Sequence, residues 1–117
     1  MAGQVPSGAP ICLLTTTGRR TGRRRTVPLL CLRDEADIVV VASRGGMSGH
    51  PAWYLNLRAD PHADVQLGPA EIPVRARDAT EEERNRLWPA LTAVYEHFDA
   101  YQARTPRRIP VVILSPA

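Results

Sequence analysis

The stretch that decides the fold is ICLLTTTGRRTGRRRTVPLLCLR, residues 11–33. Two apolar runs of strand length, residues 11–16 and 27–33, flank a polar loop that contains two glycines. Such runs, bounded by turn residues, predict a β-hairpin with its loop at residues 18–25. A symmetric turn centred at Thr21–Gly22 places Cys12 opposite Cys31, and we expect both thiols to be reduced core residues.

The rest of the chain supplies more strands and few helices. Further strands are predicted at residues 37–43, 63–68, 71–77 and 109–114. Pro28 and Pro73 should place their strands at a sheet edge or at a strand start, because proline cannot donate to the ladder. About six strands without regular strand–helix alternation predict a small antiparallel barrel with one or two helices packed on it, an α+β fold that is mainly β.

Two segments have helical signals. Residues 50–61 have Pro51 at a first helical position and Pro61 as a stop. A second helical region opens with a capping box, Thr80 with Glu83, and we expect Pro89 to divide it into a short and a longer helix.

The 117 residues predict one domain at 11–117, preceded by a flexible lead-in at 1–10. No apolar run approaches the roughly 20 residues that span a bilayer, and the first residues do not resemble a signal peptide. We therefore expect a cytoplasmic protein without a membrane anchor. The two cysteines lack metal-type spacing, so no metal site is predicted.

Positive charge is concentrated in one loop. All 15 basic residues are arginine and five of them lie at positions 18–25, so the remaining 10 arginines face 12 acidic residues, a net charge of −2. A patch of this kind suits one anionic group better than a long phosphate backbone. We predict an anion site over the alternative, a solvated charged hairpin, because arginine offers paired donors to phosphate and carboxylate groups.

Common catalytic motifs such as GxGxxG, HExxH and GxSxG are absent, which favours chemistry carried by a bound cofactor. In addition to the arginine loop, two further segments are candidate parts of the site. In VVVASRGGMSGHPAW, residues 39–53, a buried strand ends at Ser43 and three glycines follow, which allows a ligand to approach the backbone. Tyr95, Phe98 and Tyr101 share one helix face, which suits either core packing or a pocket wall for a flat substrate.

Four segments together resemble the deazaflavin-dependent nitroreductase and quinone reductase family. They are LLTTTGRRTGRRRTVPL, VVVASRGG, HPAWYLNLRADP and YQARTPRRIPVVILSP, in this order, and the resemblance covers roughly residues 11–116. It implies a split β-barrel that uses coenzyme F420, whose phosphodiester and oligoglutamate tail are anionic.

The resemblance also implies residue roles. Arg19, Arg20 and Arg25 would hold the tail and phosphate of F420. The cofactor would be lined by Ser43, Arg44, Gly45 and Gly46 and closed in by Pro51, Trp53 and Asn56 of the PxWYxNL segment. Tyr95, Phe98 and Tyr101 would face the substrate, and Ser43 or Tyr101 would orient the acceptor or relay a proton. The family often has lysine at the position of Arg20, a mild change for binding the tail. It often has tyrosine at the position of Phe98, so one hydroxyl is lost here and the acceptor preference can differ.

The expected function is hydride transfer from reduced F420 to a small electrophilic acceptor such as a quinone, an enone or a nitroaromatic. The expected protein is a monomer or weak homodimer without a nucleic-acid partner. Two alternatives remain open. One is a non-catalytic member of the same fold that binds a lipid or pigment, and the other is an arginine-rich nucleic-acid binder.

Overall fold

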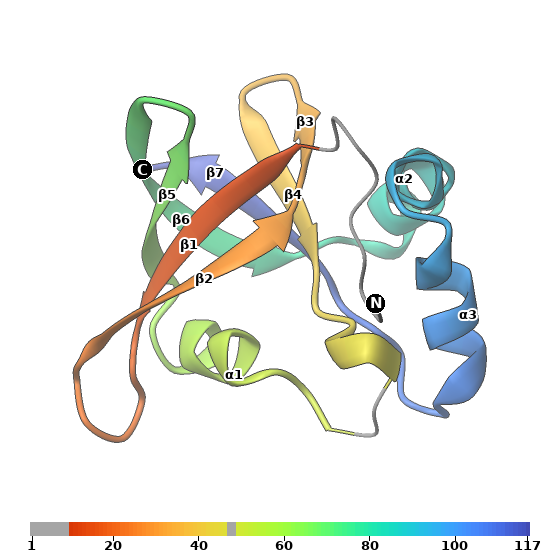
Figure 1. The fold of residues 1–117 in the computed structure, drawn as a ribbon, viewed down its shortest axis with the longest axis horizontal. Helices are drawn as coiled ribbons and strands as arrows, with labels where there is room; N and C mark the ends of the chain where they lie inside the picture. The colour runs from red at the N-terminus through yellow and green to blue at the C-terminus, as the bar shows by residue number, and fades with distance from the viewer. Residues whose placement is uncertain (1–9, 47–48) are drawn as a thin grey trace.

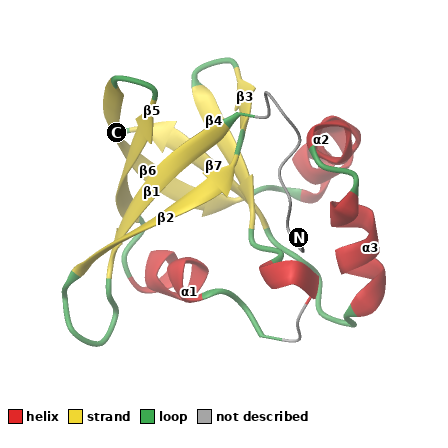
Figure 2. Cartoon of the chain, viewed as in Figure 1, coloured by secondary structure: helices red, strands yellow, loops and turns green. Residues whose placement is uncertain are grey.

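The computed structural model describes residues 10–46 and 49–117, and it shows one strongly curled antiparallel sheet with helices at its side and base (Figures 1 and 2). Most of the predicted lead-in, residues 1–9, lies outside this part of the chain. The order across the sheet is β2-β1-β5-β6-β7-β4-β3. The strands are β1 (Ile11–Thr17), β2 (Arg24–Leu30), β3 (Leu32–Asp34), β4 (Asp37–Val41), β5 (His62–Leu67), β6 (Ala70–Asp78) and β7 (Val111–Pro116).

The predicted hairpin is formed by β1 and β2, but its register differs from the symmetric expectation. Thr17 pairs with Arg24, and the loop between them is closed by a hydrogen bond of 2.7 Å from the Gly18 N–H to the Arg23 carbonyl. Gly22 has a φ of 74°, which glycine adopts without strain. The turn is therefore centred one residue earlier than predicted, and Cys12 lies opposite Leu29 rather than Cys31.

The two cysteines are nevertheless neighbours in the barrel interior. Both are free and buried, as predicted. The hydrogen bond between the two side chains, together with burial, raises the pKa of the Cys12 thiol.

The apolar run at 27–33 forms two strands instead of one, which gives seven strands where six were predicted. The break is at Cys31, whose N–H donates to the Pro10 carbonyl at 3.1 Å outside the ladder. Beyond it, β3 pairs with β4 at the other end of the sheet order. β2 also contacts β4, the neighbour of β3 in the sheet order. The passage of the chain from β2 to β3 at Cys31 therefore brings the two ends of the curled sheet together.

The prolines confirm part of the edge prediction. Pro28 lies on β2, which is an edge strand as predicted. Pro73 lies on β6, an inner strand, so that prediction was wrong for the strand as a whole. Pairing of β6 with β7 begins only at Val74, so the missing N–H of Pro73 removes no bond from that ladder.

The helices are α1 (Ala52–Ala59), α2 (Glu81–Val94) and α3 (His97–Arg104). The capping box of α2 is present as predicted, with the Thr80 hydroxyl accepting from the Glu83 N–H and the Glu83 carboxylate accepting from the Thr80 N–H. Pro89 does not divide the helix, because α2 continues to Val94 and the break comes at Tyr95–Glu96. Leu87 and Leu91, on either side of Pro89, remain buried and hold both halves against the sheet.

Hydrophobic residues are buried on both faces of the sheet. Inside the barrel, Ile38 and Val40 of β4 join a core that also takes Trp53 and Leu57 of α1. The alternate side chains of β4 belong to an outer core, which lies between the sheet and α2 and α3. In Figure 1, α1 lies below the barrel, next to the arginine loop, while α2 and α3 lie along its side.

Candidate functional site

A groove of about 430 Å³ lies between the arginine loop and α1. Its lining residues come from two segments that are far apart in the sequence and side by side in Figure 1. They are Gly18, Arg19, Arg20, Thr21, Arg25 and Val27 from the hairpin and Ala52, Trp53 and Asn56 from α1. The structure thus brings together five of the predicted cofactor residues, namely Arg19, Arg20, Arg25, Trp53 and Asn56.

Asn56 ties the hairpin to the helix. Its Oδ1 accepts from the Arg19 N–H at 3.2 Å and from the Arg19 guanidinium at 3.0 Å, and its Nδ2 donates to the Thr16 hydroxyl at 3.1 Å. Asn56 is 5% exposed and Thr16 is fully buried, so the hydrogen bond between these two side chains is shielded from water. It orients Arg19 toward the groove and fixes the distance between the loop and α1.

The five loop arginines do not share one role. Arg25 and Val27 line the groove, while Arg24, on the opposite side of β2, forms an ion pair with Asp64 and donates to Thr17 at 2.8 Å. Among the described residues, no carboxylate lies within ion-pair distance of Arg19, Arg20 or Arg25. Three guanidinium groups beside one groove, without a carboxylate partner among the described residues, leave donors that suit a phosphate or carboxylate group.

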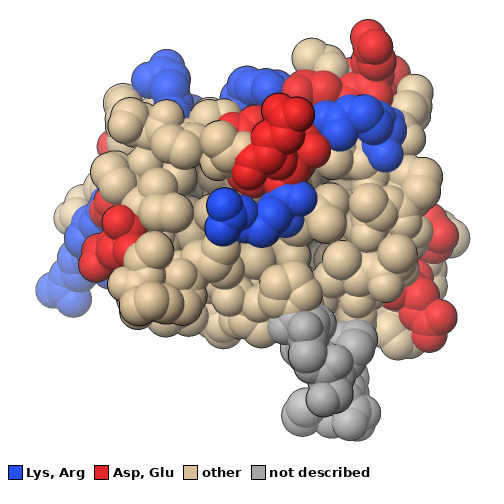
Figure 3. Space-filling view, turned by 90° about the horizontal axis from the view of Figure 1, so that it is seen from above, with Lys and Arg blue, Asp and Glu red and all other residues tan. Residues whose placement is uncertain are grey.

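Elsewhere the charges alternate in sign. Figure 3 views the molecule from above, where arginines and acidic residues lie next to one another. Arg86 pairs with Asp34 at 3.0 Å, for example, and Arg77 pairs with Glu83 at 2.7 Å. The alternation agrees with the view that the basicity belongs to one loop.

Ser43 and the glycines after it form a second region, which does not line the groove. β4 ends at Val41, and a short 3₁₀ turn, η1 (Arg44–Gly46), follows. Arg44 has a φ of 47° and Gly46 one of 78°, and the Gly46 N–H donates to the Ser43 carbonyl at 2.9 Å. A Cβ on residue 46 would come within 2.9 Å of the Tyr101 carbonyl oxygen, so glycine lets the turn pack directly against α3.

Arg107 and His50 also belong to this region, and the sequence predicted no role for either of them. The Arg107 guanidinium donates to the Ala42 carbonyl at 3.3 Å, to the Ser43 carbonyl at 2.8 Å and to His50 Nδ1 at 3.1 Å. Burial and the nearby charges of Arg107 and Arg58 lower the pKa of His50. No local pattern marks these residues, because they are 57 positions apart and Arg107 is one of 15 arginines.

The predicted substrate-facing residues lie mainly in the outer core. Tyr95 and Phe98 are 5% and 6% exposed, and only Tyr101 retains a half-exposed side chain. The Tyr95 and Tyr101 hydroxyls are 3.0 Å apart. This hydrogen bond and burial raise the pKa of Tyr95 to about 12, so its hydroxyl stays protonated at neutral pH.

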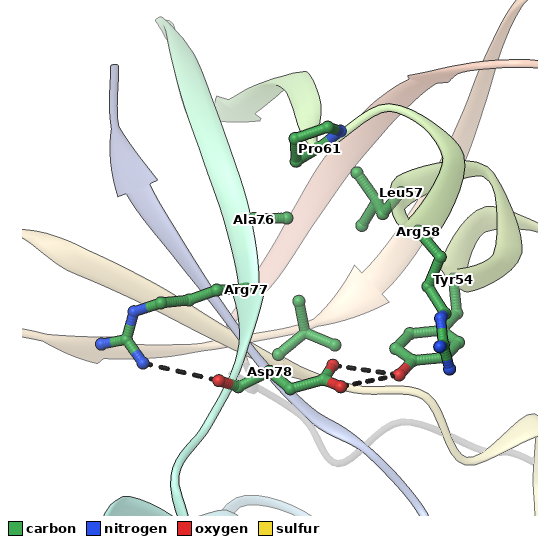
Figure 4. Close-up of a pocket in the computed structure, with 8 residues that line it drawn as sticks. Tyr54, Leu57, Arg58, Pro61, Ala76, Arg77 and Asp78 are labelled. Carbon is green, nitrogen blue, oxygen red and sulfur yellow. Dashed lines mark hydrogen bonds between the residues drawn. The ribbon is translucent and has the colours of Figure 1, made fainter.

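A smaller hollow of about 230 Å³ lies between the opposite face of α1 and strand β6 (Figure 4). Leu57, Pro61 and Ala76 form its apolar wall, and the Tyr54 hydroxyl donates to both oxygens of Asp78 at 3.0 and 2.9 Å. Burial and this hydrogen bond raise the pKa of Tyr54. The pair joins α1 to the end of β6 and so anchors the helix that carries Trp53 and Asn56.

The sequence profile of one protein family, F420H(2)-dependent quinone reductase, matches residues 1–116. The chain belongs to this family. It is 42% identical over 107 residues to a Mycobacterium tuberculosis protein named for F420H(2)-dependent quinone reductase activity, covering 92% of this chain and 90% of the relative. A second protein of that organism, named F420H(2)-dependent quinone reductase, is 36% identical over 96% of this chain and 77% of its own.

Solved structures agree with membership of the F420H(2)-dependent quinone reductase family. An F420-H2 dependent reductase superposes with a TM-score of 0.83 at 40% identity, over 91% of this chain and 94% of its own. A domain-swapped dimer superposes with a TM-score of 0.84 at 40% identity, over 91% of this chain and 80% of its own. The predicted family, the split-barrel fold and an F420-dependent oxidoreductase class are therefore confirmed.

Two further observations concern the described residues alone. None of their helices is long and apolar enough to cross a membrane. Within the same part of the chain, no group of three or more histidine, cysteine or acidic side chains is arranged to hold a metal ion.

Proposed function

We propose that this protein binds coenzyme F420 along the arginine-lined groove and reduces a quinone. The observation that supports this proposal is that Arg19, Arg20 and Arg25 line a groove of about 430 Å³ and have no carboxylate partner among the described residues. The phosphodiester and oligoglutamate groups of F420 supply the negative charge that these guanidinium groups lack. The residues present therefore fit the cofactor of the family.

The chain's own contribution is to bind and orient. Asn56 presents Arg19 to the groove, and Trp53 gives the groove an apolar wall that suits a flat ring. The backbone of the Ser43–Gly46 turn, which lies outside the groove, would offer further polar groups to a part of the cofactor that extends beyond it. Pro51 caps the helix that forms one wall of the groove. When bound, reduced F420 supplies the hydride that the acceptor receives.

The acceptor side of the site is proposed to involve Tyr101. Of the three aromatic residues on this face, Tyr101 has the most accessible side chain, and its hydroxyl already exchanges a hydrogen bond with Tyr95. Together with Ser43, it can orient the oxygen of a quinone, and the same geometry would admit an enone or a nitro group. The Tyr95 and Phe98 rings pack against the Tyr101 ring and hold it in place.

The test is a side-by-side titration of the purified protein with F420 and FMN, followed by turnover of a soluble quinone with reduced F420. We expect tighter binding of F420, because its phosphodiester and oligoglutamate carboxylates offer these guanidinium groups more anionic partners than the single phosphate of FMN does. Equal or tighter binding of FMN would contradict the proposal. Failure to bind either cofactor would favour the lipid- or pigment-binding alternative.

A further inference from the structure

Arg107 lies between α3 and β7 and contacts two groups from a much earlier part of the chain, the end of β4 and His50. Both terminal nitrogens approach the Ala42 carbonyl at 3.3 Å, and one of them also donates to the Ser43 carbonyl at 2.8 Å. The other donates to His50 Nδ1 at 3.1 Å. One planar group thus holds the end of β4 and the residue that precedes Pro51 of the α1 cap.

The turn that follows Ser43 needs such support. Arg44 is in the left-handed region with a φ of 47°, a conformation that costs a non-glycine residue energy unless the surroundings hold it. The Ser43 carbonyl accepts from both Arg107 and the Gly46 N–H, so the guanidinium shares the acceptor that closes this turn. Burial and the charge of Arg44 lower the pKa of Arg107.

The hydrogen bond from Arg107 to His50 Nδ1 determines which ring nitrogen of His50 carries the proton. A guanidinium has donors and no acceptor, so Nδ1 of His50 must accept and the ring proton is on Nε2. The His50 ring also lies 4.8 Å from the Tyr54 ring, whose hydroxyl is held by Asp78. His50 is therefore fixed on two sides, with Nε2–H as its donor.

We infer that Arg107 is a positioning residue of the cofactor site, which fixes the backbone of the Ser43–Gly46 turn and presents His50 as an Nε2–H donor. The inference rests on the proposed function in assigning this turn to the cofactor. Its geometric part concerns the protein alone and can be tested without F420.

The experiment compares Arg107→Gln and Arg107→Lys with Arg108→Gln. Arg108 is the adjacent arginine and forms an exposed ion pair with Glu81 of α2, so its variant controls for the loss of a charge and a surface contact. Ring nitrogen chemical shifts of His50, identified by their loss in His50→Gln, report the tautomer in the protein alone. Amide hydrogen exchange at Gly46 reports the turn, and F420 titration with quinone turnover reports the site.

We expect the wild type and Arg108→Gln to show the Nε2–H tautomer and a protected Gly46 amide. Arg107→Gln should give a mixed tautomer, faster exchange at Gly46 and a fall in kcat/KM of about 10- to 100-fold, as expected for misplaced binding groups. Arg107→Lys should resemble it, because an ammonium group cannot reach all three acceptors at once. It also serves as the test variant if the glutamine form does not fold.

An unchanged tautomer and unchanged Gly46 exchange in the Arg107 variants would overturn the inference. So would a kcat/KM within twofold of Arg108→Gln. If F420 binds neither the wild type nor the variants, the proposed function fails, whereas the tautomer and exchange measurements still decide whether Arg107 positions the turn.

Discussion

Replacing Asn56 by leucine tests whether the arginine loop is held in place by α1. Leucine has a similar branched shape but cannot form the three hydrogen bonds that Asn56 makes to Arg19 and Thr16. The lost bond to Thr16 leaves a fully buried hydroxyl without its partner, which costs about 1–2 kcal/mol. The two bonds from Arg19, an exposed residue, add about 0.5 kcal/mol each. We therefore expect Asn56→Leu to lower the free energy of unfolding by about 2–3 kcal/mol.

Urea unfolding monitored by tryptophan fluorescence measures this loss, and an F420 titration below the unfolding range measures binding. Asn56→Asp is the matched control. A carboxylate still accepts from Arg19, and the Thr16 hydroxyl can rotate to donate to it, so this variant should lose less stability. It should still bind F420 more weakly than the wild type, because the new negative charge neutralises Arg19. A free energy of unfolding for Asn56→Leu within about 0.5 kcal/mol of the wild type would refute the proposed role of this junction.

Three further predictions follow from single contacts. Arg25→Ala should weaken F420 binding by about 1–3 kcal/mol. Arg24→Ala removes the ion pair with Asp64 on the other face of β2 and should weaken F420 binding much less. Equal losses of affinity in the two titrations would mean that F420 does not bind on the face of β2 that carries Arg25. The pKa of Glu83 is lowered from 4.5 to about 2 by Arg77 and the capping box, so its stabilising effect is complete above about pH 4.5 and is lost as the pH falls toward 2. Thermal unfolding should accordingly show Glu83→Gln less stable than the wild type at pH 7 and equal to it near pH 2, and a constant difference across this range would be inconsistent with the pairing. Tyr101→Phe should lower quinone turnover about tenfold, near 1.4 kcal/mol of barrier, with F420 affinity nearly unchanged, while a drop in melting temperature without a kinetic effect would assign Tyr101 to the core.

The hairpin and its charge could be predicted because their signals are local. Apolar runs on either side of residues 18–25 indicate two paired strands, and five arginines in that loop indicate an anion site. The choice among the five arginines required the structure. It depends on the register of β1 with β2, which turns Arg25 toward α1 and Arg24 toward Asp64.

The sequence placed Tyr95, Phe98 and Tyr101 on one helix face, but α2 ends at Val94 and α3 begins at His97, so Tyr95 lies between the two helices. Helical spacing is also compatible with both a core and a pocket wall, and the sequence alone cannot distinguish the two. Burial separates these residues only once α3 is placed against the sheet. The roles of Arg107 and His50 are harder to predict. They depend on the segment after α3 folding back beside residues 42–50, and no spacing in the sequence encodes that contact.

The paired thiols inside the barrel give the protein a built-in reporter of unfolding. Cys12 and Cys31 are at most 1% exposed, and the raised pKa of Cys12 disfavours the thiolate that alkylating reagents attack. Cys31 is also the point where the chain crosses from β2 to β3, so a reagent reaches it only when the two ends of the sheet separate. The rate of cysteine alkylation in dilute denaturant would therefore measure how often the barrel opens, and a slower rate with F420 present would measure cofactor affinity through a chemical reaction of the protein itself.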